Sequence, residues 1–356
     1  MAGVVILGAG VMGSAMAVPL SDNGHDVRLV GTHLDREIID AIRSTGIHPG
    51  LGRELPSTIH AHQLEEAEAA FAEAEIVVSG VNSVGLEWAA ERLAALLRPG
   101  QLVIAVTKGV RAERNGDLRI LPDVLAATVP GDVREQVGWA AIVGPAIAGE
   151  VAARRETCVV FCGRDETLID RLAEVFRTGW YHVWTTTDFV GGEICAAAKN
   201  CYALGIGLAE GALERRGEAD SADRAHNYEA ALFAQSAGEI RRWASLVGGD
   251  PATADWLPGV GDLYVTSTGG RNVRVGRLLG TGLGFADAAV RLGNPTLEGA
   301  SAIRVFGETL DRLVERGVVG PEEFPLMRHL HEVIALERPV DIPWSRFFGG
   351  EPARVA

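Results

Sequence analysis

Residues 4–15 read Val-Val-Ile-Leu-Gly-Ala-Gly-Val-Met-Gly-Ser-Ala. The leading apolar run predicts a buried strand, and the segment after the glycines predicts a helix. In this Gly-x-Gly-x-x-Gly pattern Gly8 makes the tight turn, Gly10 lets the backbone approach a pyrophosphate, and Gly13 lets the helix pack closely on the sheet. The unpaired N–H groups of the helix start then face the phosphates. The stretch predicts a dinucleotide site, with Val11 and Met12 beside the phosphates.

The end of the second predicted strand, Asp26–Val30, bears on which dinucleotide binds. NAD enzymes usually carry Asp or Glu there, to bind the ribose 2′-hydroxyl. This chain has Val-Gly-Thr-His at 30–33 and no acid until Asp35. His33 and Arg36 suit a 2′-phosphate, although Arg36 equally suits a solvated helix start. Both NAD and NADP stay open, and the sequence favours NADP.

The first half of the chain alternates short strands with amphipathic helices. We expect strands at Val4–Leu7, Asp26–Val30, Ile76–Ser79, Leu102–Val106, Ala140–Val143 and Thr157–Phe161, and helices at Met12–Asn23, Arg36–Ser44 and Trp88–Leu97. Such alternation predicts an α/β fold with a doubly wound, parallel Rossmann-type sheet and right-handed crossovers.

After about residue 190 the pattern becomes helical. We expect helices at Glu193–Glu214, Asn227–Val247, Ala286–Arg291, Gly299–Arg316 and Pro321–Leu336, and a short helix after Asp250, with polar Glu214–Arg224 as a connecting loop. The predicted domains are therefore a nucleotide-binding domain at 1–189, an all-helical substrate domain at 190–345 and a tail at 346–356.

Composition restricts the partners. The 356 residues are 47% hydrophobic, and the net charge of −14 argues against nucleic acid or a membrane surface as the partner. Few cysteines, without a signal peptide or a metal-binding pattern, predict a cytoplasmic protein that binds no metal. We expect a small-molecule substrate. Apolar faces in a helical domain favour a homodimer.

Lys108 and Lys199 are the only lysines in the chain. Lys108 follows a predicted strand, at the sheet edge where α/β sites gather. Lys199 lies in Ala-Ala-Ala-Lys-Asn, on a predicted helix. If buried among these alanines it would lose hydration and have a lowered pKa, which suits proton transfer to or from an alkoxide. The alternative is a surface lysine that stretches its charge to water.

A glycine-rich stretch from Gly259 to Arg274 carries two arginines, Arg271 and Arg274. Glycine backbone beside guanidinium groups predicts an anion clamp, with a solvated turn as the alternative. Asp262 within it suits orienting a lysine or binding a substrate hydroxyl. A helix cap is its alternative role.

Together these motifs resemble the bacterial-type NAD(P)-dependent glycerol-3-phosphate dehydrogenases, in the 6-phosphogluconate dehydrogenase C-terminal-like superfamily. The matching segments occur in family order over about residues 4–300, and are residues 8–15, 107–109, 144–151, 198–200, 261–263, 271–272 and 298–299.

The resemblance implies a role for each matching residue. Lys199 is implied as the general acid/base, and Lys108 as a residue that contacts both the substrate and the cofactor. Asp262 and Asn200 complete the catalytic network. Further implied contacts with substrate or cofactor come from Gly144, Ala146, Ala148, Arg271, Asn272 and Glu298.

Several positions depart from the family pattern. Ala146 stands where the family usually has serine, and Gly270 replaces the serine before Arg271. Each lost hydroxyl leaves a substrate oxygen short of a donor, which costs about 1–3 kcal/mol if that oxygen is desolvated. The expected reaction is interconversion of a secondary alcohol and a ketone, with sn-glycerol 3-phosphate/glycerone phosphate or a related polyol as substrate. The alternatives are a β-hydroxyacid dehydrogenase acting on a carboxylate and a non-catalytic NAD(P) sensor.

Overall fold

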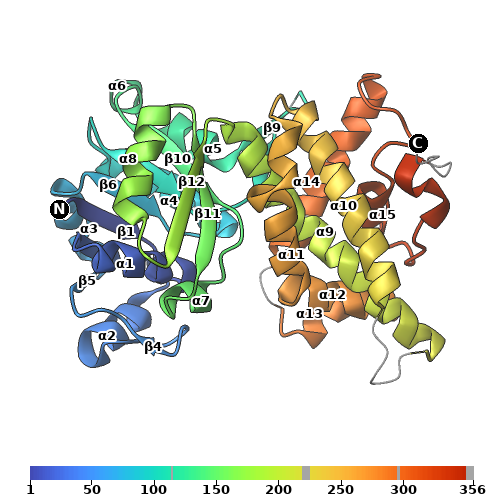
Figure 1. Ribbon diagram of the computed structural model, residues 1–356, viewed down its shortest axis with the longest axis horizontal. Coiled ribbons are helices and arrows are strands. Elements are labelled where there is room, and N and C mark those ends of the chain that lie inside the picture. Colours follow the sequence, from blue (N-terminus) through green and yellow to red (C-terminus); the bar gives the residue numbers. More distant parts are fainter. Residues whose placement is uncertain (114, 219–224, 295–296, 350–356) are drawn as a thin grey trace. The chain divides into compact units, whose positions relative to one another are not determined.

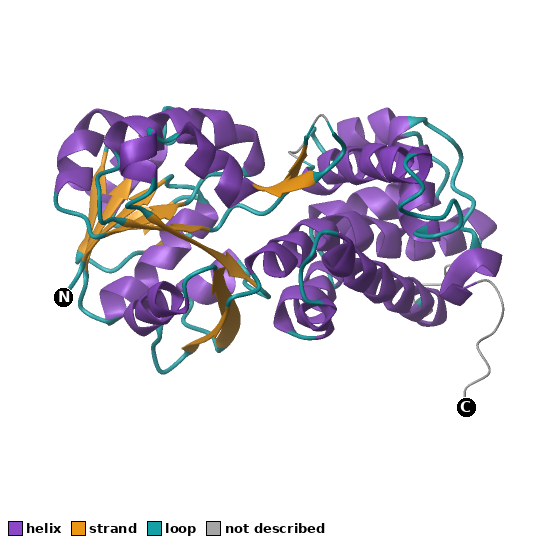
Figure 2. Ribbon diagram, turned by 90° about the horizontal axis from the view of Figure 1, so that it is seen from above, coloured by secondary structure: helices purple, strands orange, loops and turns teal. Residues whose placement is uncertain are grey.

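The computed structural model describes residues 1–113, 115–218, 225–294 and 297–349. The chain divides into two compact units, which we describe separately. The first comprises Met1–Lys108 and Ile120–Phe189, and the second comprises Gly109–Arg119 and the residues from Val190 onward. Strands gather in the first unit and helices make up most of the second (Figures 1 and 2). The predicted fold class is thereby confirmed.

An eight-stranded sheet in the order β12-β11-β10-β7-β6-β1-β2-β5 forms the centre of the first unit. Its strands are β1 (Gly3–Leu7), β2 (Asp26–Val30), β5 (Ile59–His62), β6 (Ile76–Ser79), β7 (Leu102–Ala105), β10 (Gly138–Val143), β11 (Thr157–Gly163) and β12 (Tyr181–Thr186). Because β1 pairs with β2 on one side and with β6 on the other, the strand order reverses beside β1. Ligands of open α/β sheets bind at such a reversal, outside the carboxyl ends of the strands.

Helices cover both faces of this sheet, because side chains alternate along each strand. Val4 and Ile6 of β1 belong to a core that includes residues of α1 (Val11–Asp22), α2 (Arg36–Thr45), α7 (Ala148–Ala152) and α8 (Glu166–Phe176). Val5 and Leu7 belong to a second core with α3 (Ala67–Ala72), α4 (Leu86–Leu96) and α5 (Leu121–Thr128). The smaller elements are η1 (Leu64–Glu66), η2 (Ser83–Gly85), α6 (Gly131–Arg134) and a hairpin of β3 (Ile47–His48) and β4 (Arg53–Glu54).

The sheet is not wholly parallel, in contrast to the prediction. β10 and β11 pair antiparallel, whereas β11 and β12 are parallel to each other. Only the five-residue α7 lies between β10 and β11, and such a helix is about 8 Å long. This helix does not cross back along the six-residue β10, and β11 runs in the opposite direction. The strands β5 and β12 are not among those predicted from the sequence.

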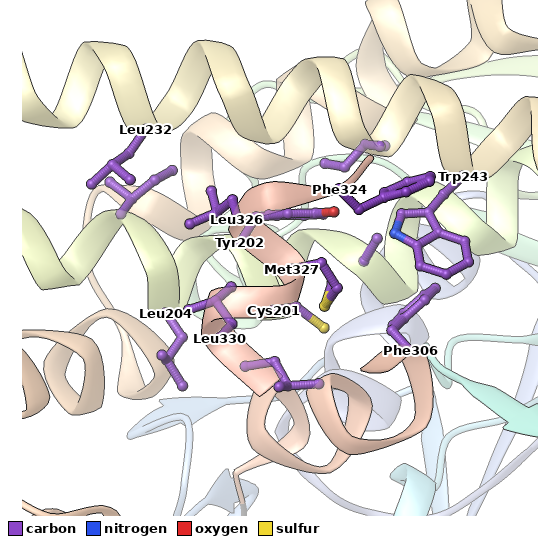
Figure 3. Packing of buried hydrophobic residues seen from close by; sticks show 14 of the residues in the cluster. Cys201, Tyr202, Leu204, Leu232, Trp243, Phe306, Phe324, Leu326, Met327 and Leu330 are labelled. Carbon is purple, nitrogen blue, oxygen red and sulfur yellow. The ribbon is translucent and has the colours of Figure 1, made fainter. Parts of the chain in front are cut away.

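The second unit is a helical body with one short ribbon. Its helices are α9 (Phe189–Arg216), α10 (His226–Leu246), η3 (Pro251–Asp255), a π-helical turn η4 (Leu257–Gly261), α11 (Asp262–Ser267), α12 (Arg271–Gly280), α13 (Phe285–Arg291), α14 (Glu298–Glu315), α15 (Pro325–Ala335) and η5 (Trp344–Gly349). In its core the Trp243 ring lies 4.7 Å, between centroids, from both Phe306 and Phe324 (Figure 3). Within the described ranges, no helix has the length and apolar character to cross a membrane.

Two predicted domain limits differ from this division. Residues 109–119, placed in the first domain by sequence, belong to the second unit, where β8 (Val110–Ala112) packs on α14. Arg312 of α14 donates a hydrogen bond to the Glu113 carbonyl at 3.2 Å, which anchors the ribbon of β8 and β9 (Leu118–Ile120). The predicted tail also starts too early, because Phe347 is only 4% exposed and packs on Trp344 in η5.

Helices extend into two stretches for which the sequence suggested irregular structure. Residues 214–216 of the expected Glu214–Arg224 loop continue α9, and residues 219–224 lie outside the described part of the chain. The glycine-rich stretch from Gly259 to Arg274 forms η4, α11 and the start of α12. Gly259 there serves close packing, since an added Cβ would lie 2.0 Å from the Ala254 carbonyl oxygen. The short helix expected after Asp250 is confirmed as η3, and Asp250 caps it by accepting from the Ala252 N–H.

Helices α9 and α12 approach each other through glycines. A Cβ on Gly276 would lie 1.9 Å from the Leu204 carbonyl oxygen, and one on Gly211 would lie 1.9 Å from the Arg277 carbonyl oxygen. Gly276 meets Leu204 and Gly280 meets Leu208, so residue numbers increase in the same direction along both helices, and α9 and α12 run parallel. Side chains would hold the two backbones apart, so this contact fixes the N-terminus of α12 beside the middle of α9.

Glu239 is a fully buried carboxyl group inside the second unit. It accepts hydrogen bonds from the N–H groups of Leu326 and Met327, at 2.8 and 2.9 Å, and so caps the start of α15. Tyr202 and Gln235 donate to the same carboxyl group. Burial outweighs these four donors and raises the pKa of Glu239 above its usual value.

We predict that Glu239→Gln separates the effect of burying a titratable carboxyl group from the effect of the hydrogen bonds that it accepts. A carboxyl group with a raised pKa in the folded state stabilises the fold most below its unfolded pKa of ~4.3, and that contribution is lost as pH rises. The glutamine does not titrate, but its amide group opposes one backbone N–H donor, at a cost of about 1–3 kcal/mol. The wild type should therefore exceed the variant in free energy of unfolding by less at about pH 8 than at about pH 5, as measured by denaturant unfolding. An advantage that grows with pH would contradict this account.

Candidate functional site

The turn after β1 has the geometry that its spacing predicts. Gly8 has φ of +112°, a left-handed conformation that favours glycine, and its N–H donates to the Val30 carbonyl at 2.8 Å. A Cβ on Gly13 would lie 2.2 Å from the Gly8 carbonyl oxygen, so α1 packs directly against the turn. Gly80, after β6, completes this contact, with its Cβ position 3.0 Å from Gly13 Cα. Gly80 lies outside the glycine pattern, and its role was not predicted from the sequence.

Gly10 differs from these glycines, because an added Cβ there would meet no atom within 4 Å. It precedes α1, whose start receives no side-chain cap from the described residues. The first intrahelical bond is the one from the Ser14 N–H to the Gly10 carbonyl, so the N–H groups of Val11, Met12 and Gly13 are available to a ligand. Open space before uncapped N–H groups fits the pyrophosphate of a dinucleotide.

The residues predicted to bind a 2′-phosphate, His33 and Arg36, lie after β2, and both contact other side chains. His33 is exposed and its ring lies 5.3 Å, between centroids, from that of Trp88 on α4. Arg36 begins α2 and forms an ion pair with Glu65 of η1. A 2′-phosphate would have to compete with Glu65 for this guanidinium group.

Lys108 lies beyond the carboxyl end of β7, where α/β sites gather. Its Nζ donates to the Gly144 carbonyl at 3.2 Å, and Gly144 follows the neighbouring parallel strand β10. Ala146 follows two residues later, and Ala148 begins α7, which packs against α1. The structure thus brings Lys108 together with the Gly144–Ala148 segment at one edge of the sheet.

Lys199 and Asp262 form a buried ion pair in the second unit. Lys199 lies on α9 and is 7% exposed, and Asp262 begins α11 and is 1% exposed. Of the alternatives for Lys199, the structure has the buried lysine and not the surface one. Asp262 does not cap α11 as an N-cap residue, since it is the first residue of that helix. Burying both charges is tolerable because each satisfies the other.

Asn200, next to Lys199, links three helices. Asn272 of α12 donates to the Asn200 side-chain oxygen at 3.3 Å and accepts from the Gly299 N–H at 3.3 Å. A Cβ on Gly299 would lie 2.5 Å from the Asn200 carbonyl oxygen, so α14 begins directly beside α9. Glu298, the first residue of α14, is half-buried next to this contact. The Asn272 amide group therefore braces the helices. Its backbone N–H precedes the first hydrogen bond of α12, from the Arg274 N–H to the Gly270 carbonyl, and is available to a ligand.

Arg271 and Arg274 lie in the first turns of α12 and are exposed. No ion pair joins either of them to a carboxylate within the part of the chain that the structure describes, whereas Arg277 on the same helix pairs with Glu214. Gly270 precedes the helix with φ of +99° and provides no side-chain cap. Two guanidinium groups beside uncapped N–H groups form a site suited to an anion.

Comparison with known proteins agrees with these features. The family described as "NAD-dependent glycerol-3-phosphate dehydrogenase" matches in two parts, its N-terminus over residues 3–169 and its C-terminus over residues 188–343. This chain belongs to that family. The resemblance stated from the motifs is thereby confirmed, and with it a nicotinamide dinucleotide, NAD or NADP, as the cofactor class.

Curated relatives span most of the chain. The NADP(+)-dependent glycerol-3-phosphate dehydrogenase of Archaeoglobus fulgidus is 37% identical over 81% of this chain and 83% of its own length. A glycerol-3-phosphate dehydrogenase [NAD(P)+] of Prosthecochloris aestuarii is 30% identical over 95% of both chains. Among solved structures, glycerol-3-phosphate dehydrogenase from Coxiella burnetii has a TM-score of 0.76 at 26% identity, covering 95% of this chain and 96% of that one.

We predict that the two glycines of the turn respond differently to alanine. Gly10→Ala should leave the melting temperature near that of the wild type, because the new Cβ meets no protein atom, but should weaken cofactor binding by roughly tenfold or more. Gly13→Ala should lower both the melting temperature and the affinity for the cofactor, because its Cβ collides with Gly8. Calorimetric titration of NADPH and thermal unfolding of both variants test this. A Gly10→Ala protein that binds NADPH as the wild type does would contradict it.

Proposed function

We propose that this protein transfers hydride between a nicotinamide cofactor and a secondary alcohol or ketone, with glycerone phosphate and sn-glycerol 3-phosphate as its substrate pair. The observation that carries the proposal is the buried Lys199–Asp262 pair, in a chain that belongs to the glycerol-3-phosphate dehydrogenase family. Such a pair suits a proton donor, because a buried ammonium group that a carboxylate holds has a fixed direction and little competition from water. The relatives named above carry the same activity in their names.

In the proposed reduction the nicotinamide supplies the hydride to the carbonyl carbon. Lys199 gives a proton to the carbonyl oxygen, so that the ketone becomes a secondary alcohol without a free alkoxide. Asp262 holds the ammonium group in position before transfer and accepts its hydrogen bond. We assign to Lys108 the stabilisation of negative charge that develops on the substrate oxygen.

We assign the substrate phosphate to the start of α12. Arg271 supplies a guanidinium group, which binds phosphate in a fork, and the first-turn N–H groups supply further donors. These donors matter for the assignment because Gly270, before Arg271, lacks the serine hydroxyl of the family pattern. Asn200 supports the arrangement through Asn272.

For the cofactor we propose NADP in preference to NAD. His33 lies exposed at the end of β2, and the first acid beyond that strand, Asp35, is turned away from solvent. A carboxylate facing a 2′-phosphate would repel it, so its absence from the exposed strand end favours NADP. The NADP(+)-dependent name of the Archaeoglobus fulgidus relative agrees with this preference. The homodimer and the cytoplasmic location stay predictions from the sequence.

We predict that removing the proton donor strongly lowers turnover but leaves cofactor binding intact. Lys199→Met alone would leave the Asp262 charge buried and unpaired, at a cost of about 3–5 kcal/mol. The double variant Lys199→Met/Asp262→Asn removes both charges and should fold. Its kcat should fall by roughly 100-fold or more, while its dissociation constant for NADPH, measured by titration, should stay near that of the wild type.

Lys199→Met serves as the comparison, because its thermal unfolding reports the cost of the unpaired carboxylate. Wild-type turnover in the double variant would show that the proton comes from another group. Loss of cofactor binding in a folded double variant would show that the pair supports the cofactor instead. Either result would overturn the assignment of Lys199.

A further inference from the structure

Asp35 is the first acid after β2, yet its carboxylate faces the interior. It is 9% exposed, and its Oδ2 accepts the Ala9 N–H at 3.1 Å and the Thr32 N–H at 2.8 Å. Ala9 is the middle residue of the Gly8–Ala9–Gly10 turn and is fully buried. One carboxylate oxygen thus ties the glycine turn to the end of β2.

His48 holds the other side of the same residue. Its Nε2 lies 2.9 Å from the Ala9 carbonyl oxygen, and the imidazole is fully buried. The Leu51 N–H donates to His48 Nδ1 at 3.1 Å, so Nδ1 is an acceptor and the proton resides on Nε2. His48 therefore donates to Ala9 as a neutral imidazole. Ser14 Oγ donates to the same carbonyl oxygen at 3.2 Å.

These contacts come from a part of the chain that has no place in the glycine motif. His48 belongs to the small hairpin of β3 and β4, and Asp35 immediately precedes α2. Gly50 of the hairpin lies close to Val11, since a Cβ on Gly50 would be 3.0 Å from Val11 Cγ1. The hairpin thus packs against the first residue of α1 as well as against the turn before it.

We propose that Asp35 and His48 are positioning residues that hold the Ala9 peptide, and through it the uncapped start of α1, in the conformation that receives the cofactor pyrophosphate. This rests on the proposed function only in naming the dinucleotide. Preorganised N–H donors bind an anion more tightly than donors that must be ordered first. The assignment also separates Asp35 from the acid of NAD enzymes, whose carboxylate binds the ribose 2′-hydroxyl.

Asp35 substitutions distinguish the two roles. Asp35→Ala removes both hydrogen bonds, whereas Asp35→Asn keeps an oxygen that accepts both N–H groups. We expect the Asp35→Ala protein to bind NADH and NADPH more weakly than the wild type, by the same factor of about tenfold. The Asp35→Asn protein should bind both cofactors as the wild type does. Calorimetric titration of the wild type and both variants with NADH and with NADPH measures the dissociation constants to be compared. If either substitution weakens the binding of NADH and strengthens the binding of NADPH, Asp35 contacts the ribose and the proposal is wrong.

His48 allows a matched pair of variants. The Gln amide nitrogen reaches the position of Nε2 and keeps the donor to Ala9, whereas the Asn amide group reaches only the position of Nδ1. We expect His48→Gln to bind both cofactors within about threefold of the wild type and His48→Asn to lose about tenfold. Equal losses in the two variants at equal thermal stability would overturn the role of His48.

Amide hydrogen exchange supplies a readout without cofactor. In the cofactor-free proteins, residues 8–14 should exchange faster in Asp35→Ala and His48→Asn than in Asp35→Asn, His48→Gln or the wild type, with the strands of the sheet unchanged. Unchanged exchange in all four variants would overturn the proposal. A wild-type protein that binds neither NADH nor NADPH would instead overturn the proposed function. The exchange experiment would still test whether Asp35 and His48 hold the Ala9 peptide in place.

Discussion

The ion pair of Lys199 and Asp262 is the constraint around which the helical unit is organised. Two buried charges are tolerated only when they meet, so α9 and α11 must keep these side chains in contact. The glycine contact between α9 and α12 acts in the same direction. It places the uncapped start of α12 beside Asn200, one residue from the lysine, where Asn272 and Gly299 complete the link. The proposed proton donor and the proposed phosphate site therefore depend on the same helix packing.

The nucleotide-binding unit solves a different problem, because its ligand-binding atoms belong to the backbone. A glycine turn has few side chains to hold it, and Gly10 faces open space. Rigidity comes from outside the motif. Gly80 supports the turn from β6, the Asp35 carboxylate holds the Ala9 N–H, and His48 holds the Ala9 carbonyl. A helix start is an anion site only while its N–H groups stay aligned, so these contacts are part of the site.

Local sequence patterns predicted what local chemistry determines. The turn at Gly8–Gly13, the strands of apolar residues and the long helices followed from spacing and periodicity. The direction of β11 did not, because it depends on the connection and not on the strand itself. The short strand β5 and the partly exposed β12 lack an apolar run long enough to recognise. The contacts of Asp35 and His48 with Ala9 span 26 and 39 residues, so only the folded chain shows them. The sequence suggested that Asp262 suits orienting a lysine, and the family resemblance placed it in one catalytic network with Lys199, but only the folded chain shows that the two side chains form an ion pair.

The substrate assignment depends on whether Arg271 and the start of α12 receive a phosphate. The most direct measurement is the loss of NAD(P)H absorbance on addition of glycerone phosphate, its unphosphorylated counterpart glycerone, and a β-keto acid, each with NADH and with NADPH. The account predicts rapid oxidation with glycerone phosphate, faster with NADPH than with NADH, and little with glycerone. Turnover of the β-keto acid while glycerone phosphate is inert would contradict it.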